Sequence, residues 1–186
     1  MAERIFYARL ESPWGKWLVA STRRGVCLVQ LGSSLARARA ELDGRWGRVE
    51  WVESRRENRA ALAALRRYFR GGLRRFRLPV DLRGSRFQLA AWRALARIPY
   101  GNTRSYKELA RAAGRPRAFR AAGMACRSNR LPIIVPCHRV VGSDGSLTGF
   151  SPLKRAGQAA PGGLRLKQRL LAHERHFKTL RGSPQE

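Results

Sequence analysis

The sequence predicts an α/β protein of the α+β type, built as two lobes and a tail. Short segments rich in β-branched residues come first, and segments with helical spacing follow them. The composition changes near Gly84, beyond which short helical patterns dominate. We therefore expect a sheet-and-helix lobe at residues 1–84, a helical lobe at 85–174 and a polar basic tail at 175–186.

The N-terminal lobe is predicted to open with a small sheet. Residues 4–10, 16–21 and 26–31 are short apolar segments with many β-branched side chains. Ser12-Pro13 and Arg24-Gly25 separate them with turn-forming residues. Two hairpin-linked strands and a third partner are therefore expected.

The rest of this lobe alternates between helical and extended patterns. Ser34 is placed to cap a helix that ends near Trp46, and residues 49–52 form a further candidate strand. A second helix is predicted where apolar residues recur at helical spacing before Gly71-Gly72. Residues 76–82 are a candidate last strand. The recurring apolar residues are Ala61, Leu62, Leu65 and Phe69.

The second lobe has the sequence pattern of a helix, a turn and a helix. Ser85 begins a first helix, which Pro99-Tyr100-Gly101 ends. Two shorter helices are expected at 105–113 and 117–128, joined by Gly114-Arg115-Pro116. This is the plan of a DNA-binding helix-turn-helix, and equally of a helical hairpin with solvated arginines. On spacing alone both interpretations are open.

A cysteine follows these helices in a stiff apolar segment. Pro132 and Pro136 bracket an apolar run, and Cys137-His138 comes directly after it. A histidine can accept a thiol proton, so the pair is a candidate nucleophile and base. A bare Cys-His pair is more often a buried cysteine beside a hydrogen-bonded histidine. An irregular basic stretch at 152–161 and a last amphipathic helix at 164–174 complete the lobe.

The charge of the chain points to a polyanionic partner. Lys and Arg number 39 against 12 Asp and Glu, which gives a net charge of +27. Neutralising phosphates releases counterions and drives binding to any nucleic acid sequence, so DNA or RNA is the leading candidate. Arginine carries nearly all of this charge, a bias that genome composition or a hot habitat also explains.

The cysteines exclude a disulfide framework. Cys27, Cys126 and Cys137 are odd in number and widely spaced, and no His/Cys cluster has metal-ligand spacing. We expect no bound metal and a reducing, cytoplasmic location, at the nucleoid if the source is bacterial. The sequence has no signal peptide pattern and no apolar stretch of membrane-spanning length.

The segment Pro136-Cys137-His138-Arg139-Val140 resembles the active-site motif of the O6-alkylguanine-DNA alkyltransferases, also called methylated-DNA–protein-cysteine methyltransferases. The resemblance spans residues 87–174 in order and spacing, apart from one insertion. It implies a winged-helix-like C-terminal domain with a helix-turn-helix and a ribonuclease-H-like N-terminal domain. The other matching residues are Phe87, Trp92, Ile98-Pro99-Tyr100-Gly101, Ser105-Tyr106, Arg120-Ala121-Ala122-Gly123, Asn129, Gly162-Gly163-Leu164 and Leu170-Leu171-Ala172-His173-Glu174.

The resemblance implies a role for each residue of a catalytic group. Cys137 resembles the alkyl acceptor, and His138 the base that reaches its thiol through a water. Glu174 resembles the carboxylate that orients and charges the histidine, which would lower the thiol pKa below its usual value of about 8.5. Without the resemblance, Glu174 reads as a solvated carboxylate at a helix end. Asn129 resembles the residue that fixes the turn before the active site, and Tyr106 the proton donor that lets guanine leave as a neutral base.

DNA contacts are implied for the second helix of the helix-turn-helix. Arg120 resembles the finger that fills the gap left by an extruded nucleotide, a use to which a long planar guanidinium is suited. The family's recognition helix enters the minor groove, where small side chains allow close approach. The remaining expected DNA-binding residues are Ser105, Ala118, Ala121, Ala122, Gly123 and Arg127.

The expected substrate pocket departs from the family pattern in one loop. Phe150 stands where tyrosine is common, and residues 152–161 are an insertion in a loop that is normally short. Arg130 also replaces a usual proline after the catalytic asparagine. The alkyl-size preference is therefore open. The residues expected to line the pocket are Tyr106, Pro132, Val140, Phe150 and Ser151.

The expected function is suicide DNA repair without a cofactor. An alkyl group would move from O6-alkylguanine in double-stranded DNA to Cys137, with O4-alkylthymine as a further candidate substrate. The protein is expected to be a monomer, which binds DNA either singly or cooperatively. Alternatives are a non-catalytic lesion sensor, whose relatives replace the acceptor cysteine, and an alkylation-responsive regulator, which usually carries a further domain. A cysteine hydrolase is disfavoured because no oxyanion loop accompanies the pair.

Overall fold

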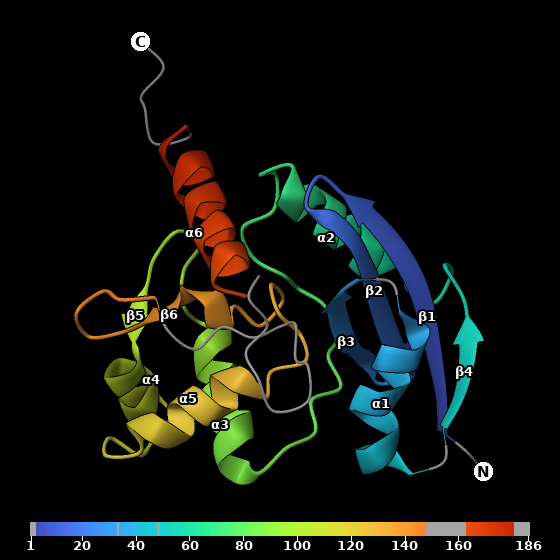
Figure 1. Ribbon diagram of the computed structural model, residues 1–186, viewed down its shortest axis with the longest axis horizontal. Coiled ribbons are helices and arrows are strands. Elements are labelled where there is room, and N and C mark those ends of the chain that lie inside the picture. The colour runs from blue at the N-terminus through green and yellow to red at the C-terminus, as the bar shows by residue number, and fades with distance from the viewer. Residues whose placement is uncertain (1–2, 33, 48, 148–162, 181–186) are drawn as a thin grey trace. The chain divides into compact units, whose positions relative to one another are not determined.

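The structure is a computed structural model that describes residues 3–32, 34–47, 49–147 and 163–180. The chain divides into two compact units, residues 1–82 and 83–186. Figure 1 labels the helices and strands of both units. The division falls close to Gly84, where the sequence changes in composition.

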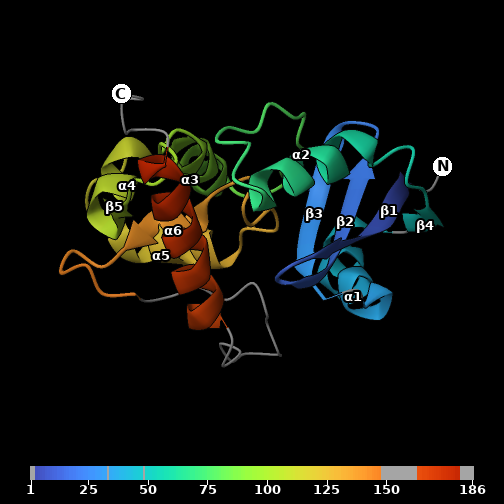
Figure 2. The ribbon, with the colours of Figure 1, turned by 90° about the horizontal axis from the view of Figure 1, so that it is seen from above.

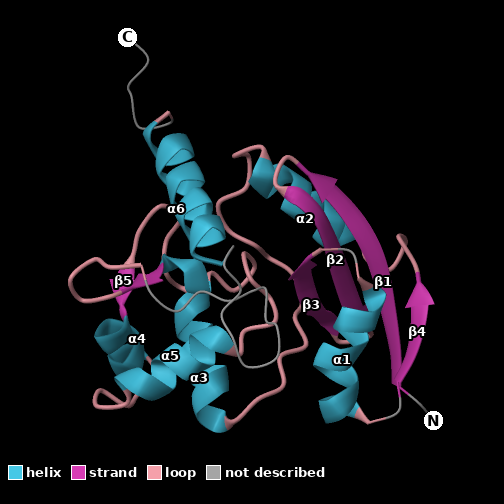
Figure 3. Ribbon diagram, viewed as in Figure 1, coloured by secondary structure: helices cyan, strands magenta, loops and turns pink. Residues whose placement is uncertain are grey.

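The first unit is built on a four-stranded sheet with the order β3-β2-β1-β4 (Figures 1 and 3). β1 pairs antiparallel with β2, and β2 pairs antiparallel with β3, as two tight hairpins. β4 returns to the opposite edge and pairs parallel with β1. The strands are β1 (Glu3–Ser12), β2 (Gly15–Thr22), β3 (Gly25–Leu31) and β4 (Val49–Glu53).

One helix covers each face of this sheet (Figure 2). Because strand side chains alternate between the faces, Leu18 packs with α1 (Leu35–Trp46), whereas Trp17 packs against Phe69 of α2 (Arg59–Phe69). The hydroxyl of Ser34 accepts a hydrogen bond from the Arg37 amide, so the predicted cap of α1 is present. Both apolar faces of the sheet are thereby buried.

The strand expected at 76–82 does not form. The segment makes a single bridge to β3, in which the Val26 amide donates to the Pro79 carbonyl at 3.0 Å and the Asp81 amide donates to the Val26 carbonyl at 2.9 Å. A proline has no amide hydrogen to continue a ladder. Gly25 also lies so close to Pro79 that a Cβ atom would meet its carbonyl oxygen at 2.3 Å.

The second unit is helical and carries the helix-turn-helix. Ser85 and Ser105 each cap the following helix in a reciprocal box, with Gln88 and Glu108 respectively. The indole of Trp92 donates to the Ala125 carbonyl at 2.8 Å and so ties the first helix of this unit to the third. The helices are α3 (Arg86–Ala96), α4 (Tyr106–Ala112), α5 (Phe119–Arg127) and α6 (Gly163–Thr179).

A two-stranded parallel pair joins the helix-turn-helix to the cysteine segment (Figure 3). β5 (Arg104–Ser105) precedes α4, and β6 (Val140–Val141) follows a 3-10 turn, η1 (Cys137–Arg139). The backbone after Cys137 is therefore hydrogen-bonded to the backbone that starts the helix-turn-helix. Within the described ranges, no helix is both long and apolar enough to cross a membrane.

The C-terminal helix is longer than expected. α6 continues to Thr179, five residues past the predicted end at Glu174, so the predicted tail at 175–186 begins as helix. The ring of Phe177 lies 4.9 Å from those of His173 and His176, and Lys178 donates to Asn102 at 2.6 Å. These contacts stabilise the last turn of the helix, which lies beyond the amphipathic segment at residues 164–174 that predicted it.

Candidate active site

Cys137 lies buried in the turn η1, and a residue that follows the C-terminal end of α5 holds its side chain. The amide nitrogen Nδ2 of Asn129 donates to the Cys137 sulfur at 3.0 Å and to the Val135 carbonyl at 2.7 Å. The Asn129 oxygen accepts from the Leu131 amide at 3.0 Å. One side chain therefore fixes both the thiol and the segment that leads to it.

The segment before Cys137 is strained as well as stiff. Ile133 has a φ of 77°, in the left-handed region that β-branched residues rarely adopt. Its conformation is held by burial and by a hydrogen bond from the Val135 amide to the Leu131 carbonyl at 2.8 Å. Pro132 is buried in the same turn. The prolines marked the stiffness in the sequence, but no residue pattern marked the strain at Ile133.

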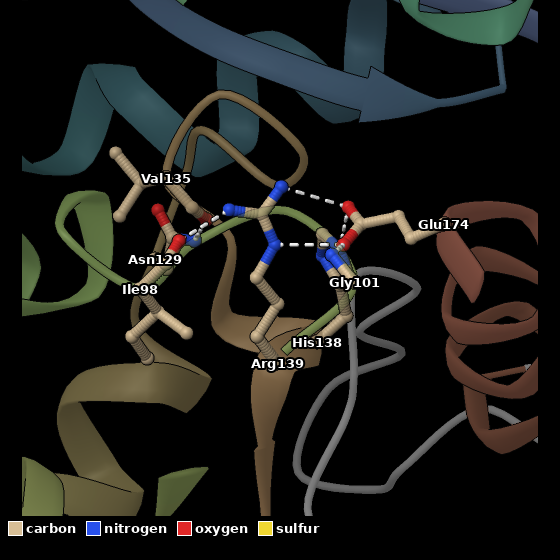
Figure 4. Close-up of polar contacts among 7 residues, drawn as sticks. All are labelled: Ile98, Gly101, Asn129, Val135, His138, Arg139 and Glu174. Atoms are coloured by element: carbon tan, nitrogen blue, oxygen red, sulfur yellow. Dashed lines mark hydrogen bonds and ion pairs between the residues drawn. The ribbon is translucent and has the colours of Figure 1, made fainter. Parts of the chain in front are cut away.

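Glu174 is the centre of a buried charge cluster (Figure 4). One carboxylate oxygen accepts from His138 Nε2 and from Arg139 Nη2, both at 2.8 Å. The other accepts from Arg139 Nε at 2.8 Å and from the Gly101 amide at 2.9 Å. Glu174 is fully buried, so the alternative of a solvated carboxylate at a helix end does not hold.

Arg139 was not predicted as a site residue. Its guanidinium binds both oxygens of Glu174 and donates to the Ile98 carbonyl at 2.6 Å. It also lies 5.6 Å from the centre of the Tyr100 ring. The available signal was a single arginine between a Cys-His pair and an apolar Val-Val pair, because a charge in such a run needs a buried partner.

Lys167 is a second buried cation that sequence reasoning missed. It is fully buried on α6, and its Nζ donates to the Val140 carbonyl at 2.6 Å. Its positive charge acts to lower the pKa of the Cys137 thiol and of the Cys126 thiol. The only sign in the sequence was its place beside Leu166 on the apolar side of a helix.

The thiol and imidazole pKa values differ from the expectation. Burial raises the pKa of Cys137, and the hydrogen bond from Asn129 and the charge of Lys167 only partly offset this. Burial likewise lowers the pKa of His138, against the opposing effect of Glu174. The expected lowering of the thiol pKa is therefore wrong: burial favours the neutral thiol of Cys137 and the neutral imidazole of His138.

Glu174 is ionised in this cluster. Burial acts to raise the pKa of its carboxyl, but the hydrogen bonds from His138 and Arg139 and the positive charge of Arg139 outweigh burial and hold that pKa well below its usual range. Glu174 favours the charged form of His138, but burial outweighs that effect, so the carboxylate orients the ring without charging it. Burial, with a smaller contribution from the charge of Arg139, accounts for the neutral imidazole.

The predicted DNA-binding residues occupy different faces of the helix-turn-helix. Arg120, Ala121 and Arg127 are exposed on α5, and Ala118 is half-buried at its start. Ala122 is fully buried, so its side chain packs in the core and has no place on the exposed face. The remaining expected residues are Gly123, where a Cβ atom would lie 3.8 Å from the Tyr106 ring, and Ser105, whose hydroxyl caps α4.

The predicted pocket is only partly described. Val140 is buried beside Cys137, and Tyr106 is half-buried at the start of α4. Phe150 and Ser151 and the insertion at 152–161 lie outside the described residues. Cys27 and Cys126 are buried in the cores of their units, where Cys27 donates to the Ala20 carbonyl. Over the described ranges no three His, Cys, Asp or Glu residues are grouped as a metal site would require.

The second unit thus combines the plan of a DNA-binding helix-turn-helix with a buried cysteine, histidine and glutamate. Two family models match the chain: the DNA binding domain of 6-O-methylguanine DNA methyltransferase at residues 86–176, and its ribonuclease-like domain at residues 5–82. The chain belongs to the 6-O-methylguanine DNA methyltransferase family. The expected ribonuclease-like N-terminal fold and helical C-terminal domain are thereby confirmed.

Individual relatives support the same assignment. The chain is 42% identical over 147 residues to a methylated-DNA–protein-cysteine methyltransferase from Methanosarcina barkeri, covering 79% of this chain and 89% of the relative. It is 48% identical over 128 residues to one from Mycolicibacterium paratuberculosis, covering 69% and 72%. The crystal structure of Mycobacterium tuberculosis O6-methylguanine methyltransferase matches with a TM-score of 0.76 and 33% identity, covering 98% and 96%. A structure of the Mycobacterium tuberculosis protein in complex with DNA matches with a TM-score of 0.74 and 33% identity, covering 94% of each chain.

Proposed function

We propose that this chain repairs alkylated DNA by moving an alkyl group from O6 of guanine to the Cys137 sulfur, once per molecule. The observation that carries the proposal is the position of Cys137: a buried thiol, held by Asn129, next to an ordered His138–Glu174 pair in a helix-turn-helix domain. Family members of this length are named for the same reaction. Double-stranded DNA carrying O6-alkylguanine is the substrate, and the site of action is cytoplasmic.

Base extrusion follows from the burial of the nucleophile. Cys137 is only 5% exposed, so its sulfur cannot reach a base that is still stacked in a duplex. The target nucleotide must leave the stack and enter the protein, at a cost of a few kcal/mol. Arg120, exposed on the recognition helix, fills the gap that the nucleotide leaves. The net charge of +27 supplies sequence-independent attraction to the phosphates.

The transfer step uses a neutral thiol and a neutral imidazole. His138 Nε2 donates to Glu174, so the other ring nitrogen, Nδ1, takes the thiol proton through a water. The sulfur then forms a bond to the alkyl carbon while the bond between that carbon and O6 breaks. Guanine receives a proton from Tyr106 and leaves as a neutral base. The imidazolium of His138 then releases its proton to solvent and the phenolate regains one, so no net proton is gained or lost.

Single turnover follows from the chemistry of the product. The alkylated cysteine is a thioether, and a thioether offers water no good leaving group from which to regenerate the thiol. The lesion supplies the alkyl group and the protein accepts it, so the step balances without a cofactor. The acceptor cysteine also argues against a purely non-catalytic lesion sensor.

Intact mass spectrometry with peptide mapping tests the proposal. The protein is incubated with an excess of duplex DNA containing one O6-methylguanine, and the repaired DNA is counted by chromatography. We expect one methyl group per protein, on the peptide that contains Cys137, and one lesion removed per molecule. Several lesions removed per molecule, or a methyl group on Cys27 or Cys126, would contradict it.

A further inference from the structure

Two large apolar side chains are exposed on the recognition helix. Phe119 is 44% exposed and Met124 is 61% exposed, both on α5. Single exposed apolar residues are common on protein surfaces, so exposure alone carries no meaning. The position of these two beside the candidate DNA-contacting arginine is what calls for an explanation.

The helix geometry places Arg120 between the two apolar side chains. At about 100° per residue, Phe119 lies to one side of Arg120, and Met124 lies one turn further along on the other side. The guanidinium of Arg120 is 5.9 Å from the centre of the Phe119 ring. At that distance the ring attracts the cation and orients the long side chain before DNA binds.

The residues around Phe119 and Met124 fit double-stranded DNA better than an apolar protein surface. Arg117, just before α5, and Arg127, at its last turn, are both exposed. Between them, Ala121 is exposed and carries only a methyl group. A surface with cations at its rim and apolar groups around a central arginine complements DNA, whose phosphates lie outside its stacked bases.

We propose that Phe119 and Met124 form an apolar wedge on both sides of Arg120 that enters the duplex and separates the bases next to the extruded nucleotide. Apolar wedges of this kind partly unstack base steps and open the groove. The wedge rests on the proposed function, in which α5 is the helix that meets the duplex. It adds residues that assist extrusion without touching the reacting atoms.

Two measurements on the full chain test the wedge. The first is the single-turnover rate of alkyl transfer from an O6-methylguanine duplex and from free O6-benzylguanine, which needs no extrusion. The second is the fluorescence of a 2-aminopurine beside the lesion, which rises when that base unstacks. The variants are Phe119→Ala, Met124→Ala and the double variant. Leu180→Ala is the matched control, because Leu180 is 59% exposed on a different segment.

The double variant is expected to be about tenfold slower on the duplex, the scale of losing one stacking contact, and unchanged on O6-benzylguanine. Its 2-aminopurine signal should fall, while Leu180→Ala behaves as the unmutated protein. Equal rates of the double variant and the unmutated protein on the duplex would overturn the wedge, as would equal slowing on both substrates. If the unmutated protein transferred no alkyl group from either substrate, the proposed function would fail, and the 2-aminopurine signal would still decide the wedge.

Discussion

The guanidinium of Arg139 binds both oxygens of the Glu174 carboxylate, at 2.8 Å each, inside the second unit. Both side chains are buried, and the same carboxylate orients His138. A buried charge that loses its partner is strongly destabilising. The stability of the domain and the orientation of the candidate base therefore depend on one carboxylate.

Replacing Arg139 tests this dependence. We expect Arg139→Met to lower the free energy of unfolding by about 3 kcal/mol, because Glu174 would remain as an uncompensated buried charge. Urea unfolding at neutral pH measures the loss. Arg4→Met, which breaks the exposed pair of Arg4 and Glu50, is the control and should cost much less. Equal losses of unfolding free energy in the two variants would show that the buried pair stabilises the protein no more than the exposed one.

The same pair makes stability depend on acidity. The Glu174 pKa is lower in the folded protein than in the unfolded chain, so the unfolded chain binds its proton first as the pH falls. The stabilisation is complete above the unfolded value of about 4.3 and is lost as the pH falls toward the folded value. In Glu174→Gln this acid-induced loss should be smaller, as followed by urea unfolding from neutral pH down to roughly pH 3. An unchanged pH profile would contradict the shifted pKa.

The sequence could predict the features of this site that neighbouring residues determine, and it could not predict contacts between residues distant in the sequence. The capped starts of α3 and α4, the turn at Gly114 and the Cys137-His138 pair are local, so spacing and residue type sufficed. Glu174 was expected only through the family resemblance, because its partners come from residues distant in the sequence. Its hydrogen-bond donor at Gly101 is a backbone amide, and no pattern of side chains in the sequence reveals such a contact.

The errors have physical causes of the same kind. Arg139 and Lys167 are charged, and charged residues are normally exposed, so their burial was not anticipated. The apolar character of residues 76–82 suggested a strand, but Pro79 limits the pairing to one bridge. The pKa of Cys137 was expected to fall because a base lies next to it in the sequence, whereas burial raises it and outweighs the hydrogen bond from Asn129 and the charge of Lys167.

The reactivity of the DNA-free thiol should reflect its raised pKa. Alkylation of Cys137 by iodoacetamide, followed by peptide mapping, is expected to keep accelerating with pH beyond the ordinary cysteine pKa of about 8.5. Lys167→Met should move this profile to higher pH, because it removes a cation that favours the thiolate. Lys107→Met, at an exposed position on α4, should leave it in place. A plateau below neutral pH would contradict a neutral resting thiol.

Arg120 should matter for DNA and not for the chemical step. We expect Arg120→Ala to slow repair of a duplex by at least about tenfold, since extrusion costs a few kcal/mol and its gap would stay unfilled. Transfer from free O6-benzylguanine should be unchanged, because no nucleotide has to be extruded. Arg93→Ala, on the α3 helix, is the control for loss of one exposed positive charge. Equal slowing on both substrates would refute the role in extrusion.

The identity of the acceptor atom can be measured directly. The unmutated protein, Cys137→Ala and Cys126→Ala are each mixed with a known amount of duplex O6-methylguanine DNA, and the remaining lesion is counted by chromatography. We predict that the unmutated protein and Cys126→Ala remove one lesion per molecule, while Cys137→Ala binds the DNA and removes none. Lesion removal by Cys137→Ala at the unmutated level would contradict the account.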